Sequence, residues 1–439
     1  MKKYNCLYIW SNILLGLLSS YITTAQEALT IEQAVALALE NNYDVRIAKN
    51  DVKIDETNIS LGNAGILPSL VAVATNNNTV LNTTQTQANG SEVEIDGARN
   101  TTLNYGLALE WTIFDGFKMF AKHKQLKEFK NLSETELKAS ILTKLSDVYE
   151  TYYTINSLQE QLKTLDSILY VSEMRVNTAK NRFSIGKASK LEVLNAEVDL
   201  NADNSTLILL RQDLKVAKIQ LNTLLARAPE TEFSTLGGIV IDESLQMQDL
   251  LALAEKQNPQ LQIQHINKKI QEYELKQIKG NRYPTLSLNS GYTFINSKTP
   301  FGFVTETSGT NFSYGFTARL SIFNGFNQNR SEKAAKLQLE STQIAIDQQR
   351  QNIQSQIAAL YQNYLSLTAL ATLEEKNEKI AGQNLEITLD KYKIGTLTPV
   401  EFRTAQNNFA SAKVRYLNAV LQAKLAEITL KELTGSLDF

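Results

Sequence analysis

The sequence has very little cysteine and no excess of positive charge. Its 439 residues include one cysteine, Cys6, and the formal net charge at pH 7 is -2. A chain that loses Cys6 with an N-terminal leader keeps no thiol, which excludes disulfide bonds, thiolate metal sites and thiol catalysis. The charge balance gives no reason to expect nucleic acid as a partner. We expect no cofactor, and stability must come from packing and assembly.

Long hydrophobic runs are also lacking, apart from one at the N-terminus. Hydrophobic residues make up 43% of the chain, and the mean hydropathy is -0.23. These values exclude a polytopic helical transporter. Two lysines precede an apolar run at residues 7–18, and small residues follow up to Ala25, which predicts a secretory signal peptide over residues 1–25. A retained anchor helix is the weaker alternative, because polar residues such as Asn12 leave the run short of the ~20 apolar residues that a span needs.

Glycine and proline are missing from one long stretch, which lies between Phe117 and Phe183. Apolar residues recur there at alternating spacings of three and four, the pattern of packed coiled-coil helices. At a rise of 1.5 Å per residue this segment predicts a rod of about 100 Å. A second long helix is predicted from Phe326 to Tyr392. Shorter partner helices are predicted at residues 43–66, 190–226 and 400–433.

An internal repeat organises the chain. Residues 104–117 read NYGLALEWTIFDGF and residues 313–326 read SYGFTARLSIFNGF, an offset of 209 residues. Upstream the offset becomes 216, which pairs Asn42 with Asn258. We expect the difference to be a longer loop in the first copy, around the polar residues 87–91. The predicted domains after the signal peptide are a first repeat at 26–227, a linking segment at 228–247 and a second repeat at 248–435.

Strict alternation of apolar and polar residues predicts β-strands before the long helices. An ordinary half-buried sheet shows the same period. Length favours a membrane sheet, because about 13 residues at ~3.3 Å each and a ~45° tilt span one ~30 Å bilayer core. The predicted lipid-facing residues are Leu103, Tyr105, Leu107, Leu109 and Trp111 in the first copy, and Phe312, Tyr314, Phe316 and Leu320 in the second.

Four predicted strands are too few to close a barrel. The strand after Pro68 is the least clear, because Val71 and Val73 compete with Leu70 and Ala72 for the apolar face. An open sheet edge cannot persist in lipid, where its backbone groups would lack hydrogen-bond partners. Oligomerisation is therefore predicted, and three protomers would supply twelve strands, which is within the size range of bacterial barrels.

Short motifs recur in the same order in the two copies. They are the strand starts at 67–68 and 283–284, the strand ends at 114–116 and 323–325, and the hairpin turns at 183–186 and 392–395. By these motifs the chain resembles the TolC-like outer membrane efflux proteins from about Leu29 to Gly435. The resemblance implies a mainly α-helical fold with membrane β-strands. Each protomer of a homotrimer would give four strands to a twelve-stranded outer-membrane barrel, which stands on a long antiparallel α-helical barrel in the periplasm.

The resemblance also implies a function. The protein would be a passive exit duct in the cell outer membrane of a Gram-negative bacterium, and not an enzyme. Its implied partners are outer-membrane lipid, a periplasmic adaptor (membrane fusion) protein and an inner-membrane pump of the RND or ABC type, in a tripartite efflux or type I secretion system. An equatorial collar would use residues 228–247 and the residues after Leu433. The cargo stays open among drugs, metals and secreted protein.

In this family the periplasmic ends of the helical hairpins meet the adaptor and form the constriction. The implied gate residues are Glu401 and Thr404, the latter at a position where the family can hold a second acid. Three copies of Glu401 on one axis would repel one another and attract cations. Alternatively, Glu401 only begins a helix beside Pro399, where a negative charge complements the helix dipole. The implied adaptor-contact residues are Gly186, Lys187, Ala188, Ser189, Gly395, Thr396, Leu397 and Thr398.

Two other classes of protein are weaker interpretations. For a hydrolase or metal enzyme the candidates are His123 and His265, but neither recurs at the matching position of the other copy. A periplasmic coiled-coil tether would explain the long helices but not the four strands rich in aromatic residues. Cell fractionation distinguishes the tether from the barrel, because a tether stays soluble whereas a barrel needs detergent.

Overall fold

The computed structural model describes residues 27–300 and 304–437. The predicted signal peptide therefore lies outside the described residues. Within them, no helix combines the length and the apolar character needed to cross a membrane.

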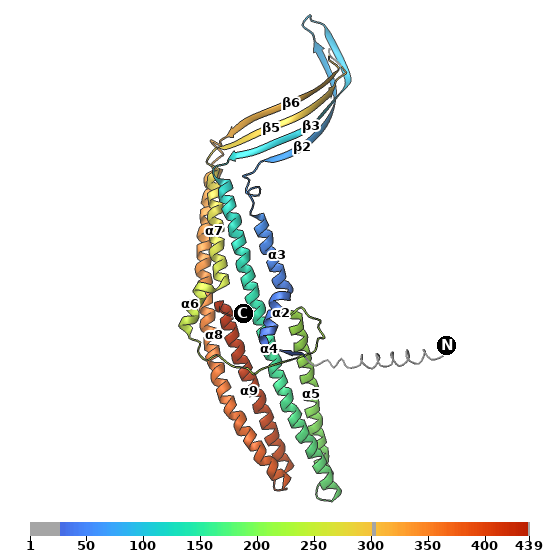
Figure 1. Ribbon diagram of the computed structural model, residues 1–439, viewed down its shortest axis with the longest axis vertical. Helices are drawn as coiled ribbons and strands as arrows, with labels where there is room; N and C mark the ends of the chain where they lie inside the picture. The colour runs from blue at the N-terminus through green and yellow to red at the C-terminus, as the bar shows by residue number, and fades with distance from the viewer. Residues whose placement is uncertain (1–26, 301–303, 438–439) are drawn as a thin grey trace, which may run out of the picture. The chain divides into compact units, whose positions relative to one another are not determined.

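The chain forms two compact units that alternate along the sequence. The helical unit comprises the residues up to Ile47, Ala139–Asn258 and those from Asn352 on, and the sheet unit comprises Ala48–Lys138 and Pro259–Gln351. Figure 1 labels the elements of both units. The first half contains α2 (Ile31–Asn41), α3 (Tyr43–Asn58), β2 (Ser69–Thr86), β3 (Glu92–Phe114), α4 (Lys118–Ser184) and α5 (Lys190–Leu224). The second half contains α6 (Met247–Gln257), α7 (Pro259–Gly280), β5 (Thr285–Lys298), β6 (Glu306–Arg319), α8 (Asn327–Lys393) and α9 (Pro399–Thr434).

The two long helices, α4 and α8, each contain 67 residues, so both predicted rods are confirmed, and α8 continues through Gly382, where an interruption was expected. The predicted partner helix at 43–66 is wrong in length, because α3 ends at Asn58. Gly62 and Gly65 follow, and Gly65 has a φ of 82°, which a helix cannot continue through. Helix α5 ends at Leu224 for a related reason, since Ala226 adopts a left-handed φ of 53°.

The predicted longer loop in the first copy is also wrong. Strands β2 and β3 have 18 and 23 residues, whereas β5 and β6 have 14 each. The extra residues of the first copy extend its strands, and only residues 87–91 form the turn between them, closed by the Gln87 amide donating to the Ser91 carbonyl at 2.8 Å. Threonine and valine are frequent in this stretch and favour extended backbone even where both faces are exposed.

The four long strands form one antiparallel sheet in the order β2-β3-β5-β6. The register places Ala72, Leu107, Tyr292 and Phe312 in one row across it. Because directly opposed side chains share a face, this row resolves the ambiguity of the first strand. Leu70 and Ala72 lie on the face of Leu109 and Leu107, and Val71 and Val73 lie on the other.

One predicted strand residue falls outside the sheet. Strand β6 ends at Arg319, which pairs with Thr285, the first residue of β5. Pro284 precedes Thr285 and has no N–H with which to extend the ladder. Leu320 therefore lies one residue beyond β6, and its assignment to the strand is corrected.

In the helical unit a buried core surrounds the middle of α4. It includes Leu145, Val148, Tyr152 and Ile155 with residues of α2, α5 and the short parallel pair β1 (Glu27–Leu29) and β4 (Phe233–Thr235). The Tyr152 hydroxyl donates to the Leu29 carbonyl at 2.9 Å and lies 2.7 Å from the Leu236 carbonyl. This buried hydroxyl therefore ties the linking segment to the long helix.

The internal repeat is visible in matched contacts of this unit. The Asn42 side-chain amide donates to the Leu224 carbonyl at 2.9 Å, and the Asn258 amide donates to the Leu433 carbonyl at 2.7 Å. Both asparagines are buried and each lies directly after a short helix. The predicted pairing of Asn42 with Asn258 is confirmed by these equivalent contacts.

Candidate functional site

The apolar face of the sheet is the first candidate surface. Apart from Leu320, all predicted lipid-facing residues share it, since Leu107, Leu109 and Trp111 stand in rows with Phe312, Tyr314 and Phe316. In the single protomer 50% of Leu107, 63% of Phe312 and 68% of Phe316 is exposed. Such large apolar side chains on one continuous face indicate a surface that something apolar covers.

The hairpin end between α4 and α5 is built by one glycine and one helix cap. Gly186 has a φ of 73°, a conformation that glycine adopts without strain. Ser189 then begins α5, and its hydroxyl accepts the Glu192 amide at 3.3 Å. The Glu192 carboxylate lies 3.6 Å from the Arg182 guanidinium. The predicted contact residues 186–189 form the exposed turn between the two helices.

The hairpin end between α8 and α9 repeats this design, with Gly395 at a φ of 80°. Here the cap is a complete capping box, because Thr398 Oγ1 accepts the Glu401 amide at 3.3 Å while Glu401 Oε2 accepts the Thr398 amide at 3.1 Å. Hydrogen bonds to the exposed Glu401 carboxylate, from the Thr398 hydroxyl at 2.7 Å and then from the Thr398 amide, lower its pKa. Thr404 is exposed, and its hydroxyl donates to the Val400 carbonyl at 3.0 Å. The helix-start role of Glu401 is therefore present in the protomer.

A polar network that the sequence analysis did not predict connects the two hairpins. Arg403 of α9 forms a bidentate pair with Asp203 of α5, at 2.9 and 2.8 Å. Ser172 of α4 donates to the same carboxylate at 2.7 Å, and the Gln406 amide donates to Ser172 Oγ at 2.9 Å. Nearby, Arg175 is buried and paired with Asp199. The sequence contains one signal that could have indicated this network: the polar residue Ser172 occupies an apolar position of the coiled-coil spacing. In the structure Ser172 is fully buried.

A cavity of about 440 Å³ lies beside this network, at the ends of the hairpins. Its walls include Ser189 and Glu192 from the first hairpin and Tyr392, Pro399 and Thr404 from the second. The Tyr392 ring stacks on Phe402 with ring centroids 4.8 Å apart. Residues of both predicted hairpin ends thus line one cavity.

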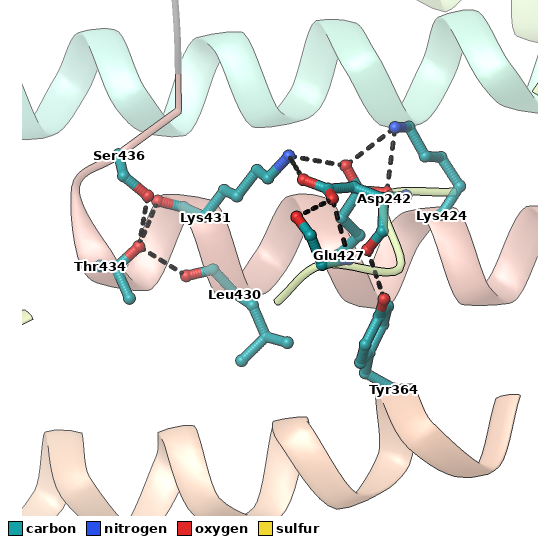
Figure 2. A network of polar contacts seen from close by, with 9 residues as sticks. Asp242, Tyr364, Lys424, Glu427, Leu430, Lys431, Thr434 and Ser436 are labelled. Atoms are coloured by element: carbon teal, nitrogen blue, oxygen red, sulfur yellow. Dashed lines mark hydrogen bonds and ion pairs between the residues drawn. The ribbon is translucent and has the colours of Figure 1, made fainter. Parts of the chain in front are cut away.

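A second polar network fixes the segment between the two halves, and Figure 2 shows it. Glu427 of α9 is 2% exposed and accepts from Lys424 at 2.9 Å and from Lys431 at 2.9 Å. Lys431 also donates to the Asp242 carboxylate at 2.9 Å, and the Asp242 amide donates to Glu427 Oε2 at 2.9 Å. Hydrogen bonds from Ser244 and then from Lys431 hold the pKa of Asp242 far below its ordinary value. The Tyr364 hydroxyl of α8 donates to the Asp242 carbonyl.

The two histidines lie on helices, His123 on α4 and His265 on α7. Across residues 27–300 and 304–437, no three histidine, cysteine or acidic side chains come together in a group that could hold a metal ion.

Comparison with known proteins identifies a family with this architecture. The family model described as "Outer membrane efflux protein" matches residues 34–227 and 250–436. The chain is 20% identical to outer membrane efflux protein BepC of Brucella suis over 428 residues, 95% of this chain and 88% of that protein. It is 20% identical to outer membrane protein TolC of Escherichia coli over 435 residues, 97% of this chain and 86% of that protein.

The fold matches as well. The crystal structure of the Campylobacter jejuni CmeC outer membrane channel superposes with a TM-score of 0.77 at 16% identity, covering 92% of this chain and 85% of that one. The resemblance inferred from the repeated motifs is thereby confirmed. Since the family model covers most of both halves, the chain belongs to the outer membrane efflux protein family.

Proposed function

We propose that this outer-membrane efflux protein works as a homotrimeric exit duct whose twelve strands close one barrel. The observation that carries the proposal is the open four-stranded sheet with its exposed apolar face. Among the described strands, β2 and β6 pair on one side only. Lipid cannot satisfy the free backbone groups of these edges, so sheets of several protomers must join edge to edge, and three of them supply twelve strands, a number within the range of bacterial barrels. The repeats at 26–227 and 248–435, joined by 228–247, would then alternate around the barrel.

The mass of the detergent-extracted protein tests this assembly. We expect a species of about three protomer masses that dissociates on heating, because the sheet edges of each protomer need partners. Size-exclusion chromatography with light scattering measures it. A monodisperse monomer that keeps its β-signal in circular dichroism would contradict the barrel.

We propose that the periplasmic adaptor contacts the cavity at the hairpin ends. The duct would work together with an inner-membrane pump of the RND or ABC type. The cavity supports the first proposal, because it lies next to the predicted contact turns and its walls combine the predicted contact residue Ser189 with apolar surface such as Val400 and Leu191. The protein itself carries out transport and no catalysis in this proposal. Efflux and type I secretion share this arrangement, and the cargo is selected by the pump.

For the gate we propose that Glu401 acts in the trimer in addition to capping α9. Its carboxylate is exposed in the protomer, so symmetry can bring three carboxylates together at the narrow end of the duct. Mutual repulsion there would be relieved by a bound divalent cation, which would block conductance. Thr404, one turn further along α9, adds no charge to such a ring.

Glu401→Gln should abolish cation block while leaving trimer formation unchanged. Glutamine also serves in a capping box, so the start of α9 is kept and only the charge is lost. Glu192→Gln is the matched control from the first repeat, where the carboxylate lies near Arg182. Planar-bilayer conductance with and without divalent cations measures the effect. If Glu401→Gln is blocked as strongly as the wild type, Glu401 only starts a helix and the gate lies elsewhere.

A further inference from the structure

A second cavity, of about 400 Å³, lies in the sheet unit where β3 turns into α4 and α7 leads into β5. The cavity is formed at a tight corner between the end of β3 and the start of α4. Gly116 has a φ of 75°, and a Cβ added there would lie 2.2 Å from the Gly280 carbonyl oxygen. Phe117 follows in the left-handed region with a φ of 66°. Only glycine at 116 lets the first turn of α4 approach the last turn of α7 this closely.

Three exposed aromatic rings form one wall of this cavity. Phe117 is the central ring, with its centroid 6.4 Å from that of Phe120 and 6.2 Å from that of Tyr283. Between 52% and 60% of each side chain is exposed. Tyrosine is enriched at the boundary between lipid and water, because its ring is apolar and its hydroxyl is polar, and the two phenylalanines add apolar surface beside it.

The aromatic wall continues the apolar face of the sheet. A bulge between Thr112 and Phe114 places Phe114 opposite Leu286, on the face that carries Leu288 and Tyr292. The Phe114 ring then meets Phe117 edge-on, with centroids 5.1 Å apart. The apolar surface therefore runs without interruption from the strands to the cavity.

The other wall is basic. Lys124 of α4 and Lys276 and Lys279 of α7 line the cavity and are exposed, and no carboxylate is among the lining residues. The Lys276 ammonium lies 4.8 Å from the centroid of the Tyr273 ring. Three positive charges beside an apolar wall suit a ligand that is anionic at one end and apolar at the other.

We propose that this cavity binds the phosphate-bearing head group of an anionic phospholipid in the periplasmic leaflet of the outer membrane. The protein belongs to a family of outer-membrane channels, and the corner joins the sheet to helices that extend into the periplasm. The corner is therefore at the depth of the inner head groups. The lysines take the phosphate, and the acyl chains follow the aromatic wall onto the apolar face. The inference rests on the proposed lipid-facing assignment of that face.

The test compares the full mature protein with the triple variant K124Q/K276Q/K279Q. A second triple variant, K190Q/K215Q/K376Q, removes the same charge from exposed helix positions away from the cavity. Native mass spectrometry of the detergent-solubilised proteins, titrated with phosphatidylglycerol, measures lipid bound per protomer. We expect the wild type and the control variant to bind alike, and the cavity variant to bind at least about tenfold more weakly. Diacylglycerol, which lacks the phosphate, should bind all three equally.

Two results would overturn the proposal. One is equal phosphatidylglycerol binding by the two triple variants. The other is binding of inorganic phosphate as tightly as phosphatidylglycerol, which would mean a site for a free anion. Conductance after reconstitution separates this failure from a failure of the membrane assignment: a wild type that never inserts refutes the lipid-facing face, whereas proteins that all insert and bind lipid alike refute only the head-group site.

Discussion

Replacing Leu107 with arginine should abolish assembly of the protein in the membrane. Leu107 lies in the middle of the part of β3 that pairs with β5, in the row that crosses all four strands through Ala72, Tyr292 and Phe312. An arginine on the lipid-facing side of a barrel costs about 2–4 kcal/mol near the bilayer midplane. A trimer carries that cost once per protomer, and the marginal stability of proteins leaves little to offset it.

Ala108→Arg is the matched control, because the next residue has the same depth and the opposite face. In the proposed barrel the guanidinium on that face reaches the aqueous interior, so trimers should still form. Heat-modifiable migration of the protein from outer-membrane fractions measures both variants. Equal loss of trimer in the two variants would show that the sheet does not separate lipid from water, and the reverse order would show that the faces are exchanged.

Glu427→Gln should strongly destabilise the segment that joins the two halves. Glu427 is 2% exposed and lies between Lys424 and Lys431. The amide removes the carboxylate that Lys424 and Lys431 share, while Lys431 keeps its pair with the Asp242 carboxylate. Removing one member of a buried ion-pair network costs roughly 3–5 kcal/mol. We expect a clearly lower temperature of unfolding and faster cleavage by a glutamyl endopeptidase after Glu243, in the segment between β4 and α6.

Glu375→Gln provides the comparison for this variant. Glu375 also pairs with a lysine on its own helix, Lys379 at 2.7 Å, but both side chains are substantially exposed. Such exposed pairs contribute little to stability because water and salt screen them, so its unfolding temperature should stay near that of the wild type. Thermal unfolding followed by circular dichroism decides between them. A Glu427→Gln protein as stable as Glu375→Gln would mean that the lysines find water and that the network contributes little.

The sequence predicted the features that depend on local pattern. Spacing alone predicted the long helices α4 and α8, and the repeated motifs predicted the strand starts. The extra length of β2 and β3 could not be predicted from the sequence. The threonines and asparagines there are polar on both faces of the strand, so no apolar–polar alternation marks it. The network around Arg403 was missed for another reason. It joins residues that are 200 positions apart, and only packing of the hairpins reveals which charged residues of a helix face inward.

The unequal strand lengths have a consequence at the cell surface. Strand β5 ends at Lys298, opposite Thr101, while β2 and β3 remain paired to Thr86 and Glu92. The part of β3 from Glu92 to Asn100 therefore pairs with β2 alone. It forms a two-stranded ribbon on the side of the sheet away from the periplasm. Among the described residues no strand of the second half pairs with this ribbon, and isolated ribbons are only marginally stable. Antibodies and phages would meet this ribbon first, and its turn at residues 87–91 is where an inserted epitope tag or a mutation that escapes recognition should leave transport unchanged.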